Sequence, residues 1–300
     1  MKEIKVNLGR KLSVENSRML GHGYYSQVYQ VDPETVVKVL KNGTVEDAER
    51  EIKLSKWAFS NGISTAISYD VVDIDGHPGL VYELLGKGSL RDRLLNYPDE
   101  FDRRLRQYAD LMHTIHNVVD TEAHLPKALD FYTEKLDDTS LITEDERQRM
   151  RMLLDTIPDT SHIVHRDCHI KNIKVVNDDL MLIDLDTLSR GDPIFDFMSV
   201  FCAYKTYSEG HGYTETDTFF DMPIAFEKRI LGTLFLMYFS DLEEDDLQEN
   251  INKVALLSYL HMLIFLDECD DEEKSTYDTD KMVGSFREYL YKSDDLRLKY

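Results

Sequence analysis

Over the first 85 residues, short apolar runs rich in β-branched and aromatic side chains alternate with turn signals, which is typical of strands. We expect five strands there, at residues 17–23, 26–31, 35–40, 67–73 and 79–85. One helix is predicted between the third and fourth strands, where Thr44 and Asp47 form a capping box and Asn61 with Gly62 ends the helical spacing. Asp75 and Gly76 predict the turn of a hairpin between the last two strands.

Beyond residue 85 the apolar residues recur mainly at helical spacing. Helices are expected around 101–115, after a capping box of Thr143 and Glu146, and at the apolar runs 230–239 and 254–266; short strands are expected at 163–164, 173–176 and 180–183. The pattern predicts an α+β chain with two lobes. The first, residues 1–85, is a small five-stranded antiparallel lobe with one helix, and the second, residues 86–300, is larger and mainly helical.

The charge of the chain narrows the possible partners. The 300 residues include 35 Lys and Arg against 57 Asp and Glu, a formal net charge of -22. Such an excess of acid is repelled by phosphate backbones and anionic lipid surfaces, so we expect no nucleic-acid or membrane partner. The net charge is -2 over residues 1–85 and -13 over residues 190–300. The acidic part either keeps the protein in solution or attracts a cationic ligand.

Three cysteines at no disulfide or zinc spacing, and an N-terminus without an apolar signal segment, favour a cytoplasmic protein. The most apolar run, 254–266, is shorter than the roughly 20 residues that span a bilayer, and it predicts a buried helix.

Two segments of the first lobe carry candidate chemistry. Gly21, Gly23 and Ser26 lie between two strands, where a glycine hairpin can fold over phosphates or can simply be a turn. Lys38 is the single charge in an apolar strand. An inward-facing lysine needs a counterion, for which Glu51 on the predicted helix is our choice, whereas an edge-strand lysine would be paired with water.

The strongest pattern is H-x-D-x-x-x-x-N, formed by His165, Asp167 and Asn172 between two short strands and followed by Asp184 at the end of another. Phosphoryl transfer needs a carboxylate that accepts the proton of the attacking hydroxyl, and further oxygen ligands for magnesium. Asp167, Asn172 and Asp184 supply this set in the right order.

With these residues the sequence resembles the protein-kinase-like superfamily and, within it, the aminoglycoside phosphotransferase and choline kinase branch. The resemblance implies a two-lobed kinase-like fold with ATP and Mg as cofactors. It implies Asp167 as the catalytic base and Asn172 and Asp184 as metal ligands. The residues implied to bind ATP are Gly21, Gly23, Ser26, Val28, Lys38, Glu51, Glu83 and Leu85.

Features after the base favour the small-molecule branch. His169 is common there, and neither a D-F-G nor an A-P-E segment follows Asp184. A G-D-P-x-x-D signature, Gly191 to Asp196, resembles that of the phosphotransferases. It implies that Asp192 and Asp196, with His165, support the site. Arg166 departs from the glycine that is usual in this branch.

The expected function is therefore an ATP- and Mg-dependent transfer of phosphate to a hydroxyl of a small, cationic molecule that is aminoglycoside-like, choline-like or an amino sugar. Asp267, Glu268 and Asp271 are candidate acceptor-binding residues, and a solvated charge run is the alternative interpretation of them. A protein Ser/Thr kinase and a non-catalytic nucleotide-binding pseudokinase remain alternatives. A metal hydrolase that uses His165 and His169 would leave Asn172 without a role.

Overall fold

The computed structural model describes residues 10–22, 26–86, 88–212, 216–217 and 219–300. It divides into two compact units. The sheet unit comprises Met1–Gly88 and Ile173–Asp186, and the helical unit comprises Ser89–Asn172 and Thr187–Tyr300. The segment 173–186 therefore groups with the N-terminal residues, whereas the sequence pattern placed it within the second lobe.

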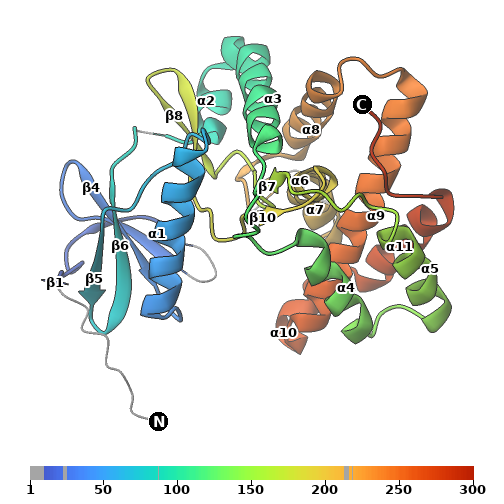
Figure 1. The fold of residues 1–300 in the computed structure, drawn as a ribbon, viewed down its shortest axis with the longest axis horizontal. Coiled ribbons are helices and arrows are strands. Elements are labelled where there is room, and N and C mark those ends of the chain that lie inside the picture. Colours follow the sequence, from blue (N-terminus) through green and yellow to red (C-terminus); the bar gives the residue numbers. More distant parts are fainter. Residues whose placement is uncertain (1–9, 23–25, 87, 213–215, 218) are drawn as a thin grey trace. The chain divides into compact units, whose positions relative to one another are not determined.

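A six-stranded sheet forms the sheet unit (Figure 1). Its strands are β1 (Arg10–Lys11), β2 (Arg18–His22), β3 (Ser26–Gln30), β4 (Thr35–Leu40), β5 (Asp70–Ile74) and β6 (His77–Glu83), in the order β1-β5-β6-β4-β3-β2. The five predicted strands are confirmed and pair antiparallel. The short strand β1 pairs parallel with β5 and was not predicted, because two exposed residues carry no alternation.

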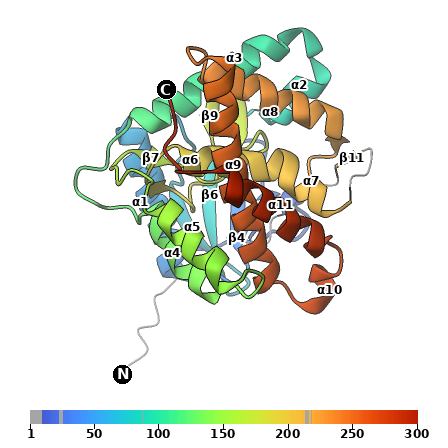
Figure 2. The ribbon, with the colours of Figure 1, turned by 90° about the vertical axis from the view of Figure 1, so that its right-hand side faces the viewer.

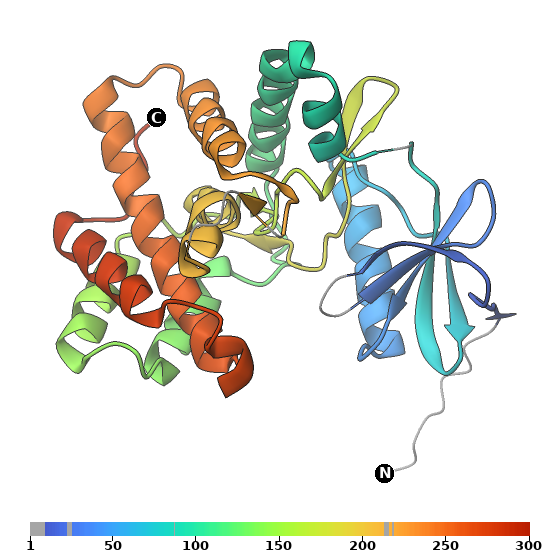
Figure 3. The same ribbon diagram turned by 180° about the vertical axis from the view of Figure 1, so that it is seen from behind.

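Strand β4 alternates between the two faces of the sheet. Val37 and Val39 pack in one cluster with strands β5 and β6. Leu40 packs on the other face with Ala48 of helix α1 (Val45–Ser60), which Figure 3 shows alongside the strands. The period of two places Lys38 on the α1 face with Leu40. The predicted capping box of α1, formed by Thr44 and Asp47, is present.

A second hairpin, β8 (Ile173–Val176) and β9 (Asp179–Leu182), belongs to the sheet unit. Asn177 and Asp178 form its turn with φ of 50° and 76°, the left-handed conformation of tight hairpin turns. Leu182 joins the hairpin to the segment before β5, because its N–H donates to Ser64 (2.8 Å) and its carbonyl accepts from Ala66 (3.2 Å). This pairing carries Asp184, two residues later, into the sheet unit.

Helices make up most of the helical unit (Figure 2). They are α2 (Leu90–Asn96), η1 (Pro98–Glu100), α3 (Phe101–Asn117), α4 (Ala128–Asp138), α5 (Glu144–Leu154), α6 (Ile194–Phe201), the π-helix η2 (Cys202–Thr206), α7 (Tyr207–Gly210), α8 (Ile224–Tyr238), α9 (Glu244–Glu268), α10 (Asp271–Lys274) and α11 (Thr279–Lys292). The strand pairs β7 (Ile163–Val164) with β10 (Ser189–Arg190) and β11 (Thr216–Asp217) with β12 (Met222–Pro223) complete it.

Helix α9 is the centre of the packing and contacts α4, α6, η2 and α11. Its residues 254–260 and 262–264 are all buried, as the apolar run predicted. Among the described residues, no helix is both long and apolar enough to cross a membrane.

Candidate active site

Lys38 is the centre of a buried polar network in the sheet unit. Its side chain is 10% exposed, and its Nζ lies 3.0 Å from both carboxylate oxygens of Glu51 on α1 and 2.5 Å from Oδ1 of Asp184. The Tyr82 hydroxyl donates to Glu51 Oε1 (2.7 Å). The sheet unit therefore brings together three of the sequence-predicted site residues.

The two carboxylates of this network keep Lys38 in its charged form. Burial by itself lowers the pKa of Lys38, but the carboxylates of Asp184 and Glu51 outweigh it and raise that pKa above its usual value. Burial raises the pKa of Glu51, although Lys38 and the Tyr82 hydroxyl oppose the rise. An ammonium held in this way can donate hydrogen bonds to an anionic ligand that approaches it.

The strands align other predicted residues with Lys38. Gly21 pairs with Val28, and Val28 pairs with Lys38, so the three lie side by side across β2, β3 and β4. Ser26 begins β3, and a Cβ added to Gly21 would meet open space. Gly23 lies outside the described residues. Glu83 ends β6, and Leu85 follows it.

Asp167 is held by its neighbours in the loop His165–Asn172 of the helical unit. The Asn172 amide Nδ2 donates to the Asp167 carboxylate (2.7 Å to Oδ2) and to its carbonyl (3.0 Å). His169 Nε2 lies 3.4 Å from the other carboxylate oxygen. The Asp167 side chain remains 44% exposed, so the carboxylate is oriented and accessible to a reactant.

Asp196 supports the backbone of this loop. Its buried carboxylate accepts the backbone N–H groups of His165 (3.0 Å) and Arg166. The His116 Nε2 donates to it (2.9 Å), and the Tyr238 hydroxyl bonds to the His116 Nδ1 (2.7 Å). Burial tends to raise the pKa of Asp196, but the bonds from His116 and the loop keep it below its usual value. The charge that orients the loop is thereby preserved.

Two buried tyrosines hold the end of the same loop. The Tyr108 hydroxyl of α3 donates to the carbonyl of Cys168, and the Tyr204 hydroxyl of η2 accepts the N–H of Ile170 (2.9 Å). Tyr108 and Tyr204 are both fully buried. These bonds fix the backbone on either side of His169, so the loop is a rigid carrier of Asp167.

Residues 18–220 match the sequence profile of a family described as the phosphotransferase enzyme family. The chain belongs to this phosphotransferase family. No curated protein sequence is significantly similar to it. The phosphotransferase family expected from the sequence motifs is confirmed.

Solved structures share the fold of this phosphotransferase. Aminoglycoside phosphotransferase APH(2″)-Ib with bound ADP has a TM-score of 0.59 at 16% identity, over 95% of both chains. A choline/ethanolamine kinase family protein from Mesorhizobium loti has a TM-score of 0.59 at 12% identity, over 93% of this chain and 89% of that one. The ternary complex of APH(2″)-IIa with streptomycin and ATP has a TM-score of 0.55 at 17% identity, over 92% and 91%. The kinase-like fold is therefore confirmed.

Several residues that hold the candidate site have no signal in the sequence. They are His116, Tyr82, Tyr108, Tyr204 and Tyr238. Each is separated by 30 or more positions from its partner in the chain. A buried histidine or tyrosine needs a polar partner, but sequence spacing does not identify one so distant.

Asp192 has a local partner. It is 4% exposed, and its carboxylate accepts the N–H of Ile194 (2.9 Å) at the start of α6. Burial raises its pKa. This contact stabilises the turn that leads to Asp196.

The three acidic acceptor candidates have different surroundings. Asp267 accepts the N–H and the hydroxyl of Ser140 (2.7 Å for the hydroxyl), and Glu268 pairs with Lys135 of α4. These contacts connect α9 to α4 and to the residues that follow it. Asp271 begins α10 and lines a surface cavity of about 420 Å³ over α10 and the start of α11.

Metal-ligand side chains are not clustered in the described part of the chain. It contains no group of three or more His, Cys, Asp and Glu side chains placed to hold a metal ion. Cys168 is fully buried, and burial raises the pKa of its thiol, which fits a packing role.

Proposed function

We propose that this phosphotransferase moves the γ-phosphoryl group of ATP, with magnesium, to a hydroxyl of a small cationic molecule. The observation that carries the proposal is the exposed Asp167 carboxylate, oriented by Asn172 in a loop whose backbone is fixed by Asp196. A base that must accept a proton from a reacting hydroxyl needs this combination of access and fixed orientation.

In this mechanism Asp167 accepts the proton of the acceptor hydroxyl. The hydroxyl oxygen forms a bond to the γ-phosphorus, and the bond between the γ-phosphorus and the oxygen that leaves with ADP breaks. Asn172 bonds to Oδ2 and His169 lies beside Oδ1, so these two side chains set the orientation of the carboxylate towards the hydroxyl. The rigid loop holds the carboxylate in place, so little reorganisation is needed during the transfer.

Lys38 binds the phosphates of the nucleotide. Glu51 maintains the charge of Lys38. The ATP phosphates would approach Nζ from the side on which Asp184 lies. Gly21, Gly23, Ser26 and Val28 cover the phosphates, and the segment that contains Glu83 and Leu85 binds adenine. Nucleotide use is supported by the ADP and ATP complexes of structurally similar enzymes.

Asn172 and Asp184 have oxygen donors that suit magnesium. Asn172 directs its amide nitrogen to Asp167, which leaves its oxygen to act as a ligand. The Asp184 side chain is 36% exposed and can supply a carboxylate oxygen. When bound, the metal would neutralise negative charge on the phosphates.

A cationic acceptor is supported by the charge of the helical unit. This unit carries 23 basic and 41 acidic residues, a net charge of -18, whereas the sheet unit has a net charge of -4. One structurally similar enzyme is solved in complex with streptomycin, and another is a choline/ethanolamine kinase family protein. Streptomycin, choline and ethanolamine are all cations, which supports a cationic acceptor.

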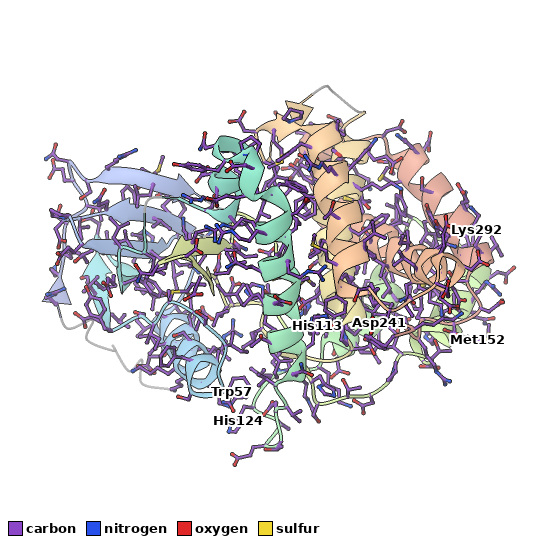
Figure 4. The ribbon with its side chains drawn as sticks, turned by 90° about the horizontal axis from the view of Figure 1, so that it is seen from above. Trp57, His113, His124, Met152, Asp241 and Lys292 are labelled. Atoms are coloured by element: carbon purple, nitrogen blue, oxygen red, sulfur yellow. The ribbon has the colours of Figure 1, made fainter. Side chains whose placement is uncertain are left out.

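The test is ATP consumption by the purified protein, with magnesium, against aminoglycosides, choline, ethanolamine, fructosamines and homoserine. Asp167→Asn should lower kcat on the best acceptor by about 10²–10⁴-fold, because it removes the base. Asp241→Asn, an exposed residue labelled in Figure 4, is the matched control and should retain activity. Equal rates for wild type and Asp167→Asn would refute the mechanism, and phosphorylation of generic protein substrates alone would favour a protein kinase.

A further inference from the structure

A short segment, Phe219–Asp221, is fixed against the loop that carries Asp167. The Arg91 guanidinium of α2 donates to the carbonyls of Phe220 and Asp221 and pairs with the Asp221 carboxylate (3.1 Å). Lys171 Nζ, from the loop itself, donates to the carbonyl of Phe219. Two cationic side chains therefore hold three consecutive residues in place, all within the helical unit.

The segment places aromatic rings against His169, the neighbour of the proposed base. His169, whose Nε2 lies 3.4 Å from the Asp167 carboxylate, meets the rings of Phe219 and Phe220 edge to face, at 5.3 Å and 5.6 Å between centroids. Phe220 is fully buried and stacks on Tyr204 at 4.9 Å. Phe219 instead remains 38% exposed. Phe219 therefore has one open apolar face next to His169, on a backbone that is held in place.

Lys171 determines whether a charged or an uncharged group can pack on the Phe219 ring. Its Nζ lies 4.6 Å from the Phe219 centroid, within the range of a cation–π contact. The ring's negative potential is thus already used by a lysine of the chain. A second cation that stacked on Phe219 would be repelled by the Lys171 ammonium, whereas carbon–hydrogen groups would still gain from burial on the ring.

We propose that Phe219 and Lys171 are specificity-determining residues that form a neutral, apolar wall for the part of the acceptor next to its reacting hydroxyl. The inference rests on the proposed function and sharpens it. An acceptor with its cation two carbons from the hydroxyl, as in choline, is disfavoured. An acceptor with a carbon face near the hydroxyl and its amino groups farther away, as in a larger amino sugar, is favoured.

The test compares choline with its neutral carbon analogue, 3,3-dimethylbutan-1-ol. Dissociation constants of both are measured by ligand-observed NMR on the enzyme with ATP analogue and magnesium, so the result does not require turnover. Wild type should bind the neutral alcohol about fivefold more tightly than choline, a factor expected from one unit charge across several ångströms of partly aqueous medium. Lys171→Met should reduce this preference to about onefold or reverse it, because the ring becomes available to a cation.

The control Lys292→Met removes the same charge from α11, where Lys292 pairs with Glu288 and is labelled in Figure 4, and should leave the preference unchanged. Phe219→Ser should weaken binding of the neutral alcohol, and Phe219→Leu, which retains an apolar side chain, should largely preserve it. Thermal unfolding of each variant reports its folding.

Wild type binding choline as tightly as the neutral alcohol, a preference unaffected by Lys171→Met, or no measurable binding of either compound would each overturn the inference. Failure of the proposed function is a separate result, since it is read from turnover on the acceptor panel and from Asp167→Asn.

Discussion

At the scale of single residues, Glu51 stabilises the buried charge of Lys38. Both its carboxylate oxygens contact Lys38, and Tyr82 donates to one of them. Glu51→Gln removes the negative charge but retains an acceptor for Tyr82. Lys38 would then lose part of the interaction that fixes its ammonium, so kcat/KM for ATP should fall about tenfold, equivalent to roughly 1.4 kcal/mol.

The matched control for Glu51→Gln is Glu49→Gln on the same helix. Glu49 is exposed and reaches only Lys53, at 4.0 Å. Steady-state kinetics with varied ATP should show wild-type values for this variant. A similar loss in both variants would indicate a general effect on α1 rather than on Lys38.

His261 in α9 makes a second prediction, on stability. Burial and, second, the positive charge of Arg166 lower the pKa of His261 to about 4. The unfolded chain, with a histidine pKa of about 6.5, binds the proton more tightly. The contribution of neutral His261 to the free energy of unfolding is fully present above a pH of about 6.5, the pKa of the unfolded state, and is lost as the pH falls towards 4. Between pH 7 and pH 5 this loss should be about 2 kcal/mol.

His261→Gln tests this dependence, because glutamine can still bond to the Tyr132 hydroxyl, which lies 3.1 Å from the His261 Nδ1. Urea unfolding of wild type and variant at both pH values gives the difference directly. We expect the variant to lose less stability on acidification. Parallel pH profiles of the two proteins would contradict the assignment.

The pair of Lys38 and Glu51 could be predicted because a lysine among valines needs a counterion when it faces inward, and the predicted helix offers Glu51. The bonds of His116 to Asp196 and Tyr238 could not, because they join α3, α6 and α8 across 80 and 122 positions. Helical periodicity indicated that this face of α3 is buried. It does not indicate which polar group lies opposite.

At the scale of elements, the π-helix η2 links the core to the 165–172 loop. Wider π turns inside α-helices often occur at functional sites. Here η2 carries Tyr204, whose hydroxyl accepts the Ile170 N–H and whose ring stacks on Phe220. Tyr204→Phe leaves that buried N–H without its acceptor, at a cost of about 1–3 kcal/mol.

Without this bond the loop that carries Asp167 should be held less firmly. Tyr204→Phe should therefore lower kcat about tenfold, while KM for the acceptor should change less than about twofold. Tyr259→Phe is the control, since Tyr259 is equally buried but bonds to Glu209 rather than to the loop. It should lose stability without the loss of kcat. Equal kcat values in both variants would argue against a positioning role for η2.

Elements with a local cause were predictable. The capping boxes at Thr44 and Thr143 were confirmed, and so was the turn at Asp75 and Gly76, whose φ values are 53° and 90°. Strand β1 and the π character of η2 were missed. The first pairs with a parallel partner about 60 residues away, and the second lies in a segment that packs against α8 and α9.

At the scale of the whole molecule, the two units differ in charge. The helical unit has a net charge of -18 and the sheet unit of -4. The fold class followed from the alternation of strands and helices. The place of the 173–186 hairpin did not, because it depends on the pairing of Leu182 with residues 64–66.

This asymmetry predicts different salt effects for the two substrates. Raising NaCl from about 20 mM to about 200 mM shortens the screening length from roughly 20 Å to 7 Å. The long-range attraction of a polycationic acceptor to the acidic helical unit is then screened, and its KM should rise about fivefold. A neutral acceptor such as homoserine has no such attraction, so its KM should stay within about twofold, and KM for ATP should not rise in parallel. Initial rates at several salt concentrations measure all three. An equal rise for charged and neutral acceptors would mean that the acidic surface serves solubility and does not guide the acceptor.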